Sequence, residues 1–290
     1  NSRGNTLRDL ERYQEALDSY DRAIELQPDY HYAWNSRGNT LRDLERYQEA
    51  LDSYDRAIEL QPDYHYAWSN KGYVFYRLHR LQESIQCFVE VTKLNPDEKD
   101  AWNNQAYLRL VAYSYGLESP IVGKPLLIRQ SQYLENNHDI DSINLEECRQ
   151  SLSLIDKALQ LDPEFAICLA NKSFPCYYLA QYKNALQSCD TVLALDPENR
   201  EQMNEVVYSN RGYILLALGA LDEALQSFSS SLDIDLECSE AWLGHGTVLY
   251  ALGRYSEAYE SLNHALALQH PLAKAKLTLT QKHLQSQRKQ

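Results

Sequence analysis

Apolar and small side chains recur along most of this chain with the spacing expected of two amphipathic helices joined by a short turn. Between residues 31 and 64 the recurring positions are Trp34, Gly38, Leu41, Ala50, Tyr54 and Ala57. Neighbouring positions in each half of this set lie three or four residues apart, so each half falls on one helical face. The pattern predicts helices at about 32–44 and 47–59. A Pro-Asp step follows the second helix and ends it, because proline cannot continue a helix interior.

The pattern repeats every 34 residues, and residues 35–68 copy residues 1–34 letter for letter. A repeat of this length predicts a solenoid, in which each unit buries its apolar face against its neighbours. Small residues recur where the two helices of a unit must approach closely, and a bulky side chain there would force them apart. These residues are Gly4, Gly38, Gly72, Ala106, Ser173, Gly212 and Gly246.

The repeat resembles the tetratricopeptide repeat (TPR) family, whose pattern places tryptophan, glycine, tyrosine, alanine and proline at fixed positions of a 34-residue unit. The second unit matches it with Trp34, Gly38, Tyr47, Ala50, Tyr54, Ala57 and Pro62. The tandem copies also resemble long bacterial repeat arrays, particularly cyanobacterial ones. The resemblance implies an all-α fold, a right-handed superhelical solenoid of antiparallel helix pairs. It also implies a protein that binds other proteins and is not an enzyme.

About seven units and a C-terminal capping helix account for the whole chain. We expect units at 1–30, 31–64, 65–98, 99–165, 166–199, 205–238 and 239–272, and the capping helix at 273–290. The fourth unit carries an insertion at about 117–142, and its second helix is expected at Leu145–Leu161. The insertion contains Pro120, Gly123 and Pro125, which predict a loop, yet it is too apolar for a free linker. Since residue 1 falls at position 5 of a unit, we expect the chain to be a fragment at its N-terminus.

Charge and composition exclude several classes of function. The formal net charge is −13, which argues against nucleic acid, because phosphates demand a basic surface. No apolar stretch is long enough to span a bilayer. The six cysteines show no paired spacing, and Cys168, Cys176 and Cys189 are expected to be buried core residues, not a metal site. We therefore expect a cytoplasmic protein without cofactor, metal or catalytic residues.

In the TPR family the first helix of each unit lines the concave surface, and positions 2, 5, 6, 9, 12 and 13 of the unit are exposed there. An asparagine amide both donates and accepts hydrogen bonds, so a column of asparagines could grip a peptide backbone with flanking tyrosines. The predicted peptide-binding residues are Asn70, Asn104, Asn171, Asn210, Asn39, Tyr73, Tyr76, Tyr107, Tyr177 and Tyr213. The first four resemble the asparagine ladder in the repeat region of O-linked N-acetylglucosamine transferase. The alternative is that asparagine is merely tolerated at this position. The two-carboxylate clamp of chaperone-tail receptors fails at three of its five positions, Asn35, Asp100 and Asn104.

Two functions remain open. The first is an interaction scaffold that holds a peptide or partner protein in its concave groove. The second is the sensor or regulatory arm of a larger signalling effector that carries an NTPase or protease domain. An RNA-binding helical repeat conflicts with the acidic charge.

Overall fold

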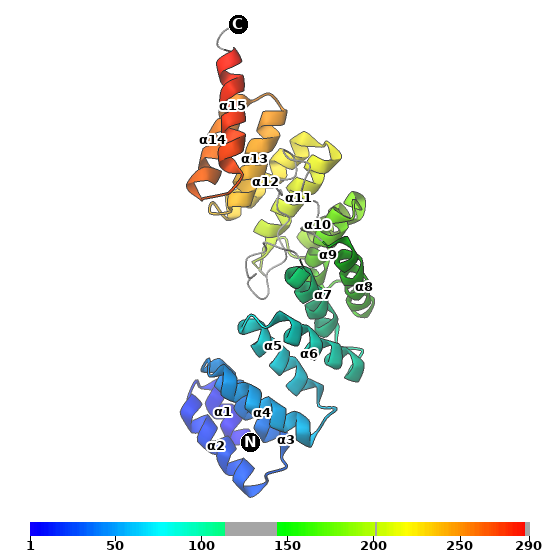
Figure 1. The fold of residues 1–290 in the computed structure, drawn as a ribbon, viewed down its shortest axis with the longest axis vertical. Coiled ribbons are helices and arrows are strands. Elements are labelled where there is room, and N and C mark those ends of the chain that lie inside the picture. The colour runs from blue at the N-terminus through cyan, green and yellow to red at the C-terminus, as the bar shows by residue number, and fades with distance from the viewer. Residues whose placement is uncertain (114–143, 201, 288–290) are drawn as a thin grey trace. The chain divides into compact units, whose positions relative to one another are not determined.

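The computed structural model of the chain describes residues 1–113, 144–200 and 202–287, and every regular element in these ranges is an α-helix (Figure 1). The insertion expected at 117–142 lies outside the described residues. The described helices are α1 (Ser2–Asp9), α2 (Tyr13–Leu26), α3 (His31–Asp43), α4 (Tyr47–Leu60), α5 (His65–Arg77), α6 (Leu81–Leu94), α7 (Lys99–Tyr113), α8 (Leu145–Leu161), α9 (Ala166–Tyr178), α10 (Tyr182–Leu195), α11 (Asn204–Leu218), α12 (Leu221–Ile234), α13 (Ser239–Ala251), α14 (Tyr255–Ala267) and α15 (Ala273–Gln287). The predicted all-α fold of paired helices is confirmed.

The chain forms two compact units, residues 1–112 and 113–290. In the first unit α1 packs on α2, α3 on α4 and α5 on α6, and each pair packs on the next through α2 with α3 and α4 with α5. The first helices α1, α3 and α5 also contact one another in order. They therefore form one continuous surface of this unit, which we call the first-helix surface.

The second unit repeats this arrangement. It contains the pairs α9–α10, α11–α12 and α13–α14, and its first helices α9, α11 and α13 are again in contact. The terminal helix α15 packs on α14 and α13. There Ala273 and Leu277 are buried against Leu243 and Leu262, so α15 packs on the apolar face of the last pair.

Close approach of the paired helices explains the recurring small residues. A Cβ added to Gly38 would lie 2.6 Å from Cε1 of Tyr54, and that tyrosine is fully buried. A Cβ on Gly212 would lie 2.7 Å from the Phe228 ring in the same way. The expectation that these positions allow two helices to approach closely is therefore confirmed.

Polar bonds also join several repeats to the one before. In four repeats the side chain at position 7 is arginine or lysine and pairs with an aspartate on the second helix of the preceding repeat. These ion pairs are Arg37–Asp21, Lys71–Asp55, Lys172–Asp156 and Arg211–Asp190. Three pairs span sixteen residues and the last spans twenty-one. The extra residues before α11 therefore leave the bond between the repeats intact.

The tryptophan at position 4 makes a second bond of this kind. Its indole N–H donates to the backbone carbonyl of Pro28, Pro62 or Pro96 in three repeats. In the last repeat Trp242 donates to the carbonyl of Leu236 at 2.9 Å. Proline is thus not required for this contact, because the acceptor is the main chain.

Candidate protein-interaction site

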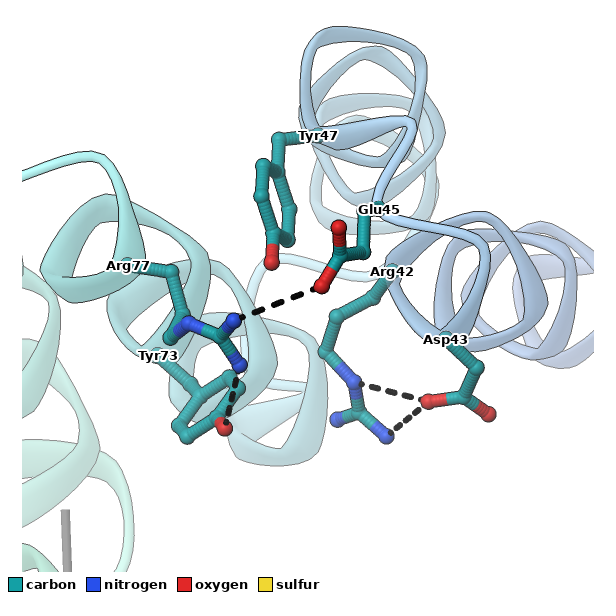
Figure 2. A pocket seen from close by; sticks show the side chains of 6 residues that line it. All are labelled: Arg42, Asp43, Glu45, Tyr47, Tyr73 and Arg77. Carbon is teal, nitrogen blue, oxygen red and sulfur yellow. Dashed lines mark hydrogen bonds and ion pairs between the residues drawn. The ribbon is translucent and has the colours of Figure 1, made fainter. Parts of the chain in front are cut away.

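A pocket opens on the first-helix surface of residues 1–112, at the C-terminal ends of α3 and α5 (Figure 2). Its volume is about 300 Å³, and it is lined by Arg42, Asp43, Glu45, Tyr47, Tyr73 and Arg77. We call these six residues the arginine pocket. Arg42 and Arg77 lie in the last turns of their helices, where the helix dipole favours a cation.

The two guanidinium groups of the pocket differ in how firmly they are held. Arg42 donates to Asp43 at 2.9 Å and to the amide oxygen of Asn70 at 3.3 Å, and it lies 5.5 Å from the centre of the Tyr73 ring. Arg77 also faces a ring, with the centre of Tyr47 5.7 Å away, but its polar contacts are longer, 3.4 Å to the Tyr73 hydroxyl and 3.6 Å to a carboxylate oxygen of Glu45. Arg77 is therefore the guanidinium more readily available to a ligand.

The identical repeats show what is particular to this pocket. The preceding junction has Asn39 and Asp43 at the positions that Tyr73 and Arg77 occupy here. There the arginine equivalent to Arg42 is Arg8, and its Nε donates to Asp43 at 2.9 Å. Here Arg77 stands at the position of that aspartate, so Arg42 lacks the carboxylate partner from the following repeat that Arg8 has in Asp43. Arg77 also adds a second cation, so this junction carries more positive charge than the first.

An exposed row of aromatic rings lies at the other end of the same helices. It comprises Tyr30, His31, Tyr32, Tyr64, His65 and Tyr66, which we call the aromatic row. Tyr32 and Tyr64 have ring centres 5.3 Å apart and nearly perpendicular planes, and Tyr64 continues to Tyr66 at 5.6 Å. The exposed fractions of Tyr32 and Tyr66 are 47% and 56%. Large exposed rings in contact with each other are typical of interaction surfaces.

The predicted peptide-binding residues of the first unit have different environments. Asn39 and Asn70 are partly exposed, but both make internal bonds. The Asn39 amide oxygen accepts from the Tyr54 hydroxyl at 2.8 Å, which leaves its two N–H donors for a ligand,. Asn70 donates to the side chain of Asn35 at 3.1 Å. Tyr73 lies in the arginine pocket, and Asn104 is partly exposed, whereas Tyr76 and Tyr107 are buried.

The predicted residues of the second unit are mostly inside it. Asn171 and Asn210 have exposed fractions of 1% and 0%, and the Asn210 amide donates to the Ser173 hydroxyl at 3.2 Å. Tyr213 is buried and donates to the main-chain carbonyl of Glu240 at 2.8 Å. The expected column of exposed asparagines therefore does not continue through this unit, because both amides are buried in it. Tyr177 is partly exposed and contacts Tyr178 and Tyr182.

Sequence reasoning did not select Arg42, Arg77, Tyr32 or Tyr66. All four fall at positions 2, 12 or 13 of their repeats, which the family resemblance already marks as exposed. The signal that could have identified Arg77 was the difference between the third repeat and the two identical ones at position 13.

The buried cysteines contribute to the core. Burial raises the pKa of the Cys176 thiol to about 11 and that of Cys189 to about 12, so both are neutral thiols near pH 7. Among the described residues, no cluster of three or more histidine, cysteine or acidic side chains could hold a metal ion. None of the helices described is long and apolar enough to cross a membrane.

Comparison with solved structures shows the same arrangement of helices. YrrB, described as a TPR protein with an unusual peptide-binding site, is 16% identical, with a TM-score of 0.58 over 78% of this chain and 96% of its own. A tetratricopeptide repeat protein from Parabacteroides merdae is 13% identical, with a TM-score of 0.59 over 97% of this chain and 96% of its own. In the APC/C hetero-tetramer Cut9-Hcn1, the matched chain is 12% identical with a TM-score of 0.64; the match covers 96% of this chain and 48% of that one. At these identities the likeness is one of fold.

Family models of the tetratricopeptide repeat match residues 1–65 and 209–272, and a further one matches residues 65–98. These matches cover more than half of the sequence. Together with the paired helices, the close-approach glycines and the bonds between repeats, they show that the chain belongs to the tetratricopeptide repeat family.

Proposed function

We propose that this chain is a protein-interaction scaffold that binds a peptide segment of its partner on the first-helix surface of residues 1–112. It acts by binding and not by catalysis. The observation that carries the proposal is the pairing of an open polar pocket with an exposed aromatic row on the same set of helices. YrrB, a distant neighbour of the same fold, is described as having a peptide-binding site, which supports the proposal by analogy.

The physical basis lies in how these side chains are supported. Tyr64 contacts both Tyr32 and Tyr66, so little conformational entropy is lost when a ligand packs on these rings. Tyrosine also supplies a large apolar face together with a hydroxyl that can bond to a peptide. Asn39 offers its N–H donors to a ligand carbonyl, because its own oxygen is already occupied by Tyr54.

Selection from a random library of linear peptides tests this proposal on the full chain. We expect an enriched consensus whose binding is weakened about thirtyfold or more by Tyr32→Ser together with Tyr66→Ser, because truncating a central aromatic contact typically costs about 2 kcal/mol. Helicity should be unchanged, since both rings are exposed. A matched control is Leu26→Ser, an exposed apolar side chain on a second helix, which should bind like the parent. Failure to enrich any peptide, or equal binding by the tyrosine variant, would contradict the proposal.

A further inference from the structure

One face of α5 joins the aromatic row to the arginine pocket. Tyr66, Tyr73 and Arg77 follow one another at intervals of seven and four residues, so they point to the same side of the helix. The eleven residues from Tyr66 to Arg77 correspond to about 16 Å of helix. An extended peptide covers that distance with about five residues.

The charges in the pocket favour a negative ligand group. Asp43 already accepts from both Arg8 and Arg42, at 2.9 Å each, so its carboxylate is fully engaged. Glu45 is the remaining carboxylate, and 72% of its side chain is exposed. Its bond to Arg77 is 3.6 Å long, and an exposed pair of this kind contributes little stability. A ligand carboxylate could therefore replace Glu45 at Arg77 with little loss.

The donors in the pocket are also arranged for an anion. The Tyr73 hydroxyl accepts a hydrogen bond from Arg77, which leaves its own proton for a ligand oxygen. The guanidinium of Arg77 offers several N–H groups in one plane, a geometry that matches a carboxylate. Figure 2 shows Arg77, Tyr73 and the hydroxyl end of Tyr47 gathered on one side of the pocket.

A structural role for the two arginines is the competing explanation. Cations in the last turn of a helix offset the negative end of its dipole, and Arg8 and Arg42 recur at the same position of identical repeats. That explanation accounts for Arg42. It does not account for Arg77, because the preceding repeat has Asp43 at the equivalent position and still forms its helix.

We propose that this face binds an extended acidic peptide, with a carboxylate in the arginine pocket and an apolar side chain, about five residues away, on the aromatic row. The peptide occupies the first-helix surface, so this inference rests on the proposed function. It adds the chemical class of the ligand. The carboxylate can belong to an aspartate or glutamate side chain or to a chain end.

The probe is a panel of fluorescein-labelled peptides on a glycine-serine background. Each carries one tyrosine and one glutamate separated by an increasing number of residues, with both chain ends blocked. Fluorescence anisotropy against the full 290-residue chain should give the strongest binding at a separation of about five residues. Replacing the glutamate by glutamine should weaken that peptide about tenfold. Further arms carry a free C-terminal carboxylate or a phosphoserine in place of the glutamate, to separate the sources of negative charge.

The chain provides its own control variant. Tyr73→Asn together with Arg77→Asp gives the pocket the same lining residue types as the preceding junction, which has Asn39 and Asp43, so the fold should be kept. This variant should bind the glutamate and glutamine peptides equally. Arg77→Gln should give the same loss of discrimination without adding a negative charge. Glu45→Gln should bind the glutamate peptide about twofold to threefold more tightly, because it removes the internal competitor.

The outcomes separate the two proposals. If peptides bind but the glutamate and glutamine peptides bind equally, the proposal of an acidic ligand is wrong and the scaffold function stands. The same conclusion follows if the Arg77 variants still prefer glutamate to glutamine. Preference for phosphoserine over both carboxylate sources would also overturn it. If no peptide of the panel binds up to about 1 mM and the random library likewise enriches nothing, both proposals are overturned.

Discussion

Position 15 of the repeat adopts a left-handed backbone in the described turns between paired helices, whichever residue occupies it. The residues there are Glu11, Glu45, His79, Ala180, Gly219 and Gly253. The angle φ is +56° at Ala180 and +78° at Gly219. Side chains other than glycine are strained in this region because Cβ approaches the carbonyl oxygen. Four of these turns therefore carry a strain that the two glycine turns avoid.

Exchange of the residue at position 15 should change stability in both directions. Ala180→Gly should raise the free energy of unfolding by about 0.5–1 kcal/mol, because relief of strain exceeds the added entropy of the unfolded chain. Gly219→Ala should lower it by a similar amount, about 1 kcal/mol. A Cβ on Gly219 would meet no atom within 4 Å, so the effect would report the backbone and not a clash. Urea denaturation measures the free energy of unfolding of both variants. A stabilising effect of Gly219→Ala would refute the explanation by backbone strain.

His245 should make the last repeat sensitive to acid. Its Nδ1 lies 2.9 Å from the Ser261 hydroxyl, and the Trp242 ring packs beside it. Burial lowers the pKa of His245 below 6.5, and the charge of Arg254 lowers it further, while Glu257 acts in the opposite direction. The unfolded chain therefore binds the proton first, so this contribution to stability is complete above pH 6.5 and is lost as the pH falls towards the folded pKa,.

Replacing His245 by glutamine tests the direction of this pH dependence of stability. His245→Gln keeps a partner for Ser261 but cannot be protonated. The melting temperature of the parent should fall more steeply than that of the variant between about pH 7.5 and pH 5. Parallel curves would show that His245 does not titrate across this range.

At the scale of the helix, packing between repeats decides what a polar side chain does. Asn210 on α11 is buried and donates to Ser173 on α9. Asn70, at the same position of a repeat in the first unit, also bonds to the preceding first helix, through Asn35 at 3.1 Å, but it is partly exposed. The same residue type at the same position therefore joins neighbouring first helices in both units, and only its exposure differs between them.

A double-mutant cycle should measure this bond. Asn210→Ala should lower the free energy of unfolding by about 1–3 kcal/mol, because it removes a buried hydrogen bond. Ser173→Ala should cost less, and the two changes should be non-additive by about 0.5–1.5 kcal/mol. Strict additivity of the pair would mean that the bond contributes nothing.

The helices were largely predictable from sequence, and the site was only partly so. Amphipathic spacing predicted the bounds of α8, Leu145–Leu161, as observed, and those of α4 to within one residue. Helix period and capping are local properties of the sequence, which is why the bounds could be predicted. Exposure of a polar position is not local. Asn210 and Tyr213 lie at family surface positions yet are buried, since the neighbouring repeat covers them. The pocket formed by Arg42 and Arg77 likewise depends on two different repeats being stacked.

At the scale of the whole molecule, each repeat is stabilised by its own pair of helices and by its neighbours. The identical segments 1–34 and 35–68 show the second contribution directly, since the same residues differ in burial between the copies. Thr40 is fully buried in α3, whereas its copy Thr6 is exposed in α1. Each threonine hydroxyl donates to the carbonyl four residues before it, at 3.2 Å. Their local bonds are therefore equivalent, and the difference between them comes from the stacked neighbours.

The same substitution in the two copies should therefore have opposite effects in this chain. Thr40→Ala removes a buried methyl group and should lower the free energy of unfolding by about 1 kcal/mol. Thr6→Ala loses no buried surface and should raise it by a few tenths of a kcal/mol, because alanine has the higher helix propensity. Urea titration followed by circular dichroism at 222 nm resolves the difference, with Thr6→Ser as a control that keeps the hydroxyl. Equal effects in the two copies would mean that local sequence, and not the neighbouring repeat, sets the stability of each helix pair.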